Sequence, residues 1–254
     1  MIGTLKRIRI ASLLFGVALW AVAGTCARAG IVVVPSALAS VEGNTNNGFP
    51  FNLDNFSVTS QRYQQVYASS QFPAGPLLIT QIAFRPSAGA GAAFSSTLPN
   101  IRIDLSTTSA APDALSTTYA SNVGADDATV FNGALSLSSA FTGPGAGPKA
   151  FDIVISLTTP FTYNPGTGNL LLDVRNSGAG LTTQFDADNT FGSITSRVFN
   201  TDVNGATGTA DSTGLVTQFT FGSGSPVVPE PHSVVLLVSG LVGLLGVSHL
   251  RRPR

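Results

Sequence analysis

Short runs rich in β-branched and aromatic residues, separated by clusters of Gly, Pro, Asn, Asp and Ser, fill most of the chain after residue 30. In the run IRIDLS, apolar residues at 101, 103 and 105 alternate with polar residues at 102, 104 and 106. A period of two is typical of a strand with one face in the core and one in water. No extended segment of this region has the period of an amphipathic helix. The pattern predicts an all-β domain.

We expect a β-sandwich ectodomain over residues 30–221, and the runs that we expect to form its strands begin at Ser57. They are SVTSQRYQQVYA, PLLITQIAFRP, IRIDLSTT, TVFNGALSLS, AFDIVISLTT, GNLLLDVRNS, TTQFDA, TSRVFN and LVTQFTFG. Short strands with turn clusters between them favour an antiparallel β-sandwich, with a jelly-roll-like arrangement. Longer loops are expected at 86–100, 142–149 and 200–214, where small residues cannot fill a core.

The N-terminal end has a different composition. A basic start is followed by an apolar stretch over 10–24, and the small residues Ala27 and Ala29 give the pattern of a signal peptidase site. We therefore expect signal peptidase to remove a signal peptide over 1–29 during export across the inner membrane. The mature chain then begins at Gly30.

The C-terminal end carries a second apolar stretch, over 232–250, which is long enough for a helix to cross a thin bilayer. Prolines just before it resist extension of the helix, and arginines after it favour a cytoplasmic end at 251–254. We expect a Gly/Ser/Pro linker over 222–231, then a single transmembrane helix. A buried helix of a globular domain is the alternative, but such helices usually have a polar face.

These features together resemble the bacterial PEP-CTERM sorting signal. The matching residues are Val228, Pro229, Glu230, Pro231, Arg251 and Arg252. The resemblance implies cleavage near the motif by an exosortase, then delivery to the envelope surface or release, in a host that makes exopolysaccharide. The protein would be anchored in the membrane only transiently. A GPI signal also has an apolar tail, but the Pro-Glu-Pro triplet and the terminal arginines argue against it.

The region between the two ends has its own resemblance. RYQQVYASSQFPAGPLLITQIAFRP, with the later GNLLLDVRN, TTQFDA and GLVTQFTF, looks like a bacterial exported domain that often carries a PEP-CTERM tail. This resemblance transfers no catalytic residue to the chain.

Charge and cysteine content exclude several classes of partner and site. Residues 30–228 hold six basic and twelve acidic side chains, which disfavours nucleic acid as a partner. The only cysteine, Cys26, lies in the predicted signal peptide, so the exported domain has no disulfide. A lipoprotein with Cys26 as the lipidated residue is an alternative that the residues around it do not favour.

The usual catalytic groups are missing from the predicted domain. The two histidines, His232 and His249, both lie in the tail, so neither a Ser-His-Asp or Cys-His triad nor a His-rich zinc site can form. We predict no catalytic residue and no enzymatic activity. Paired aspartates of a glycoside hydrolase are the remaining alternative, with Asp104, Asp152, Asp173 and Asp186 in predicted strands. Outward-facing aspartates paired with arginines such as Arg102 and Arg175 are the favoured interpretation.

Two kinds of ligand site stay open. Calcium prefers oxygen ligands, and three groups of residues offer them: Asp126 with Asp127; Asp186 with Asp188 and Asn189; and Asp202 with Asn204 and Asp211. Such residues are also ordinary turn formers. In RYQQVY, Tyr63 and Tyr67 share one face of a strand and would stack on a sugar if exposed, although tyrosines more often pack at the edge of a core.

Three functions therefore remain as hypotheses. The first is a non-enzymatic cell-envelope or extracellular-matrix protein with a structural or adhesive role. The second is a module that binds carbohydrate, such as exopolysaccharide. The third is a hydrolase that uses paired aspartates.

Overall fold

The computed structural model describes residues 30–178 and 180–222. The predicted signal peptide, the linker after residue 222, the sorting motif and the apolar stretch over 232–250 lie outside these residues. Among the residues that are described, no helix is long and apolar enough to span a bilayer.

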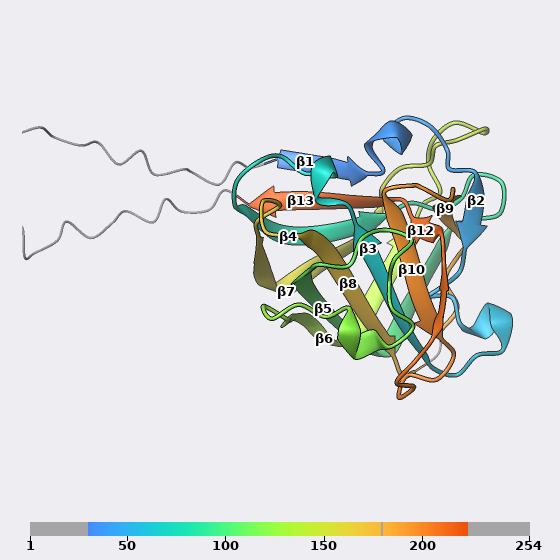
Figure 1. The fold of residues 1–254 in the computed structure, drawn as a ribbon. Helices are drawn as coiled ribbons and strands as arrows, with labels where there is room; N and C mark the ends of the chain where they lie inside the picture. The colour runs from blue at the N-terminus through green and yellow to red at the C-terminus, as the bar shows by residue number, and fades with distance from the viewer. Residues whose placement is uncertain (1–29, 179, 223–254) are drawn as a thin grey trace, which may run out of the picture. The chain divides into compact units, whose positions relative to one another are not determined.

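The strands form three sheets, and all of their pairings are antiparallel (Figure 1). The four-stranded sheet has the order β1 (Gly30–Val34), β13 (Thr217–Gly222), β4 (Leu77–Phe84) and β7 (Ile153–Tyr163). The six-stranded sheet has the order β11 (Thr209–Asp211), β10 (Thr195–Asn200), β3 (Gln61–Tyr67), β8 (Asn169–Asn176), β5 (Phe94–Thr108) and β6 (Ala128–Ser139). The third sheet consists of β12 (Thr213–Leu215), β9 (Phe185–Asn189) and β2 (Thr45–Asn47). The all-β, antiparallel prediction is confirmed.

Helical structure in the described residues is limited to single 3₁₀ turns. These are η1 (Ser36–Leu38), η2 (Asp54–Phe56), η3 (Ser69–Gln71) and η4 (Tyr119–Ser121). Every run predicted to be a strand overlaps one. The predicted loop at 86–100 is wrong in its second half, because β5 already begins at Phe94 and pairs there with β6. Leu98 in this part of β5 is fully buried in the main core, and it pairs with Leu135 of β6.

The main core lies where the inner faces of the four-stranded and six-stranded sheets meet. Its side chains come from both sheets, including Ile79, Ile155 and Phe219 on one side and Ile103 and Leu172 on the other. Across the interface Tyr67 meets Phe219 edge to face, with ring centroids 5.0 Å apart. Such aromatic pairs add to the free energy gained from burial alone. The described domain therefore holds together through apolar packing.

The first and last described strands are neighbours. Gly30 pairs with Phe221, and the pairing continues to Val34 opposite Thr217. Strand β1 is an edge strand, whereas β13 lies inside the sheet between β1 and β4 (Figure 1). The two ends of the described region consequently lie at the same end of the four-stranded sheet.

Candidate functional site

The prediction that Tyr63 and Tyr67 form an exposed, sugar-stacking face of β3 is wrong, because this face of the strand points into the domain. Tyr63 and Tyr67 are both fully buried. The Tyr63 hydroxyl donates to Gln65 Oε1 at 2.6 Å, and the Tyr67 hydroxyl lies 2.9 Å from Thr217 Oγ1. Burial raises the pKa of both phenols well above 10. Each ring packs between the sheets, so neither can contact a ligand at the surface.

The outer face of the six-stranded sheet carries a network of charges. Two neighbouring rows cross β3, β8 and β5, with Arg62, Arg175 and Arg102 in one row and Gln64, Asp173 and Asp104 in the other. Asp104 and Asp173 lie directly opposite each other and are 1% and 3% exposed. The sequence therefore correctly predicts aspartates on an outer strand face with arginine partners, but it does not predict their burial. The loop between β5 and β6 lies against this face, where the Tyr119 carbonyl accepts a hydrogen bond from Gln64.

Each carboxylate of this pair is occupied. Asp173 accepts hydrogen bonds from Arg62 Nη2 at 2.6 Å and Gln64 Nε2 at 2.8 Å. Asp104 accepts hydrogen bonds from Arg102 Nε at 2.9 Å and Arg175 Nη1 at 3.0 Å. A general acid or base must reach a bond of its substrate. These two groups are instead enclosed by their cationic partners.

A second buried ion pair joins β4 to the third sheet. Arg85, which directly follows β4, donates from Nε to Asp186 Oδ2 at 2.7 Å, and both side chains are almost fully buried. Arg85 Nη2 also donates to the carbonyls of Leu38 and Val41, at 2.8 and 2.6 Å. The guanidinium lies over the Phe151 ring, 4.8 Å from its centroid. The pair therefore ties the N-terminal segment to the domain.

Burial dominates the ionisation of Asp186. Removal from water raises the pKa of its carboxyl to about 6, although the Arg85 charge acts in the opposite direction. Between about pH 4 and 6 the folded state binds more protons here than the unfolded state, so stability rises as pH falls.

We expect the free energy of unfolding to increase on acidification from pH 7 to 5, by about 1 kcal/mol from this group. Urea unfolding of the full chain at several pH values measures the slope. In Asp186→Asn the part of the pH dependence of the unfolding free energy that comes from Asp186 should disappear. The pKa of Asp127 is also raised by burial. Because both proteins contain Asp127, its contribution cancels when their two pH dependences are subtracted. Equal slopes in the two proteins would contradict the assignment to Asp186.

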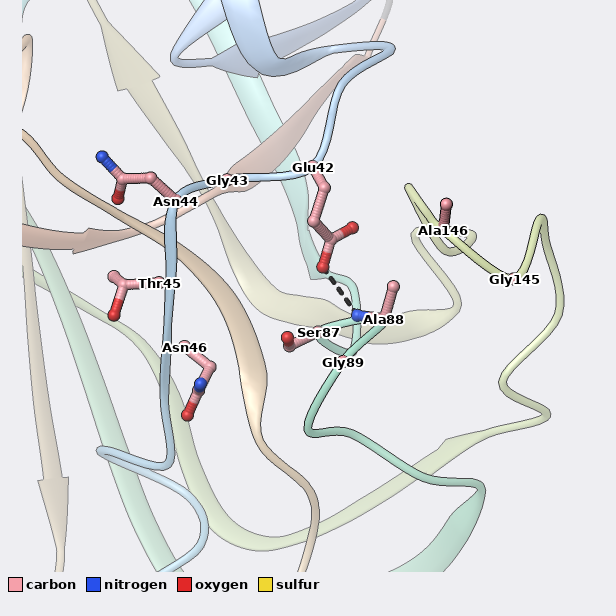
Figure 2. A pocket seen from close by; sticks show the side chains of 10 residues that line it. All are labelled: Glu42, Gly43, Asn44, Thr45, Asn46, Ser87, Ala88, Gly89, Gly145 and Ala146. Carbon is pink, nitrogen blue, oxygen red and sulfur yellow. Dashed lines mark hydrogen bonds between the residues drawn. The ribbon is translucent and has the colours of Figure 1, made fainter.

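A polar pocket of about 310 Å³ opens beside this ion pair. Its walls come from the segment 42–46, from the loop after β4 and from the loop between β6 and β7 (Figure 2). Glu42, the only glutamate of the described residues, lines it. Glu42 Oε1 accepts a hydrogen bond from the Ala88 amide at 2.6 Å. Its other oxygen, Oε2, is buried and has no hydrogen-bond partner in the described part of the chain.

The Glu42 carboxylate is confined by Gly147. This glycine has φ +83°, and a Cβ atom at this position would collide with Glu42 Oε2. Asn44, Asn46 and Ser87 add further polar groups to the pocket. The side-chain oxygens that line the pocket can accept hydrogen bonds from hydroxyl groups of a ligand. It offers a single carboxylate, so it does not match the paired acids of a glycosidase.

Most of the predicted calcium residues bond to other groups of the protein. Asp126 accepts hydrogen bonds from the amide and the hydroxyl of Thr107, at 2.7 and 2.6 Å. Asp188 accepts from the hydroxyls of Thr190 and Ser193, both at 2.7 Å. The Asp186 carboxylate is bound by Arg85 and by the Gly43 amide.

The third predicted group is also used within the protein. Asp202 Oδ1 accepts from the Asn204 amide at 2.9 Å, and Asp211 accepts two hydrogen bonds from Arg197 at 2.8 and 2.9 Å. The described residues contain no group of three or more His, Cys, Asp or Glu side chains placed to hold a metal ion. Calcium binding therefore stays a prediction from the sequence.

Sequence reasoning missed the pocket at Glu42 because its walls come from three distant segments. Glu42 itself stands in an irregular segment with no recognisable motif around it. Comparison of the chain with family models, with curated proteins and with solved structures gives no match.

Proposed function

We propose that this chain is an exported, non-enzymatic protein of the cell envelope or extracellular matrix, with a structural or adhesive role. In this proposal residues 30–222 are a β-sandwich of jelly-roll-like arrangement. The tail after them is a PEP-CTERM sorting signal that a membrane exosortase removes.

One observation carries the non-enzymatic part of the proposal. Three of the four aspartates that a hydrolase would need are buried and bound: Asp104, Asp173 and Asp186 all accept hydrogen bonds from arginines. The fourth, Asp152, lies just before β7 and not in a strand, and it accepts a hydrogen bond from the Ala140 amide at 2.9 Å. Hydrolysis of a glycosidic bond needs two free carboxyl groups, one on each side of the bond. The sandwich therefore fits a binding or structural role better than hydrolysis.

The sorting part of the proposal rests on sequence and on the position of β13. This strand ends at Gly222, and Val228, the first residue of the motif, follows after a short Gly/Ser/Pro stretch. Proteases cut preferentially where the chain is not part of a folded domain, and the motif follows the last strand of the described domain in the sequence.

The sorting proposal predicts a processed chain. Intact mass and terminal peptides of the protein from the native envelope and medium should give Gly30 as the first residue. The C-terminus should fall near Pro229 to Ser233. Replacing Pro229, Glu230 and Pro231 together by alanine should leave the chain ending at Arg254.

The matched control is Pro226→Ala, which changes a proline of the same linker outside the motif. It should be processed like the natural chain. A natural chain that still ends at Arg254 in the envelope would contradict exosortase processing and leave a membrane-tethered protein.

A further inference from the structure

Phe191 is the most exposed large apolar side chain in the described residues, at 85%. It stands in the turn between β9 and β10, where the Ser193 amide donates to the Thr190 carbonyl at 3.0 Å. Gly192 has φ +78°, the conformation that a type II turn requires at its third position. Phe191 therefore occupies the second position, at the tip of the turn.

The turn is held in place by two aspartates. Asp188 binds both of its ends, through hydrogen bonds from the Thr190 and Ser193 hydroxyls. Asp113, from a distant loop, accepts from the Gly192 amide at 2.7 Å. The Asp113 amide in turn donates to Ser196 Oγ at 2.8 Å. An exposed aromatic ring on a fixed turn loses little conformational entropy when it binds something.

A pocket of about 330 Å³ lies beside the ring, and Phe191 forms part of its wall. The remaining wall combines the apolar side chains of Leu115 and Ala210 with five polar residues, which are Asp113, Ser196, Arg197, Asp211 and Ser212. Asp113 uses Oδ2 for the turn, and its Oδ1 has no hydrogen-bond donor among the residues that the structure describes. The carboxylate of Asp211 is about one-third exposed.

We propose that Phe191 and this pocket bind a neutral hexopyranose unit of a polysaccharide. The C–H face of the sugar stacks on the ring, and its hydroxyls donate to the carboxylates of Asp113 and Asp211. Specific pockets combine an apolar surface with a few fixed polar groups in this way. Two carboxylates against the single guanidinium of Arg197 disfavour an anionic sugar. The proposal does not depend on how the chain is sorted.

The surroundings of Phe191 favour a sugar over a protein or a lipid surface. Large contiguous apolar patches mark surfaces that bind proteins or membranes. None of the other exposed large apolar side chains of the described residues lines this pocket. These are Ile31, Val41, Phe56, Val154 and Leu181.

Titration calorimetry of the full chain in detergent micelles tests the site. The probes are the hexasaccharides of β-1,4-linked glucose, α-1,4-linked glucose and β-1,4-linked N-acetylglucosamine. We expect saturable binding of at least one of them, weakened about tenfold or more in Phe191→Ala. Phe191→Tyr keeps the ring and should bind within about threefold of the natural chain.

The matched control is Phe56→Ala, the same change at another exposed phenylalanine that does not line the pocket. It should leave binding unchanged. The proposal is overturned if none of the three probes binds, or if Phe191→Ala binds as well as the natural chain. Phe191-dependent binding to phosphatidylcholine vesicles, without binding of the sugars, would assign the ring to a membrane surface instead.

Discussion

Replacing Arg85 by methionine is expected to lower the free energy of unfolding by about 3–5 kcal/mol at pH 7. Methionine fills much of the space but leaves the Asp186 carboxylate buried without its cation. The carbonyls of Leu38 and Val41 lose their donor as well. Urea unfolding followed by near-ultraviolet circular dichroism reports this directly, because all four tyrosines are buried in the native domain.

The control for this change is Arg102→Met. The Arg102 side chain is 45% exposed, and its partner Asp104 keeps Arg175 and the Thr129 hydroxyl. We expect a loss of about 1 kcal/mol or less, as for other exposed pairs. Combining Arg85→Met with Asp186→Asn should recover part of the lost stability, because no isolated charge is then buried. A double variant less stable than Arg85→Met would contradict the electrostatic explanation.

The second large effect is expected from Phe219→Ala, at about 3–5 kcal/mol. Phe219 is fully buried on β13 and contacts the rings of Tyr67 and Phe72, with centroids 5.0 and 5.4 Å away. Its removal leaves a cavity between the two large sheets. The same unfolding experiment measures the change.

Phe191→Ala is the matched control, since it is the same substitution at an exposed site. Its effect on stability should stay within about 0.5 kcal/mol, as for other surface changes. The contrast also separates loss of sugar binding from loss of fold in that variant. Similar destabilisation by both substitutions would mean that the core does not lie between the sheets at Phe219.

The alternation of residues predicts strands well but does not predict which face of a strand is buried. In RYQQVY both faces carry polar residues, so the sequence does not show that the tyrosine face points inward. Tertiary contacts decide which face is buried. The Gln65 side-chain amide can be buried because it forms hydrogen bonds with the backbone N–H and carbonyl of Leu215, at 2.8 and 2.9 Å. That contact joins residues far apart in the chain, and no local pattern contains it.

Candidate sites were harder to predict for the same reason. The aspartates at 186 and 188 form a plausible calcium cluster in the sequence, yet one binds Arg85 and the other fixes the turn of Phe191. Phe191 has no local signal, since phenylalanines are common in buried strands. Only the fold shows that its turn faces water beside a polar pocket.

The placement of β13 sets an order on folding. A chain delivered from its N-terminus presents β1 and β4 long before residues 217–222, yet both strands pair with β13. The four-stranded sheet therefore cannot be completed until residues 217–222 are available. Because the strand that joins β1 to β4 comes last along the described chain, closure of this sheet depends on pairing between its two ends, and such long-range pairing forms slowly.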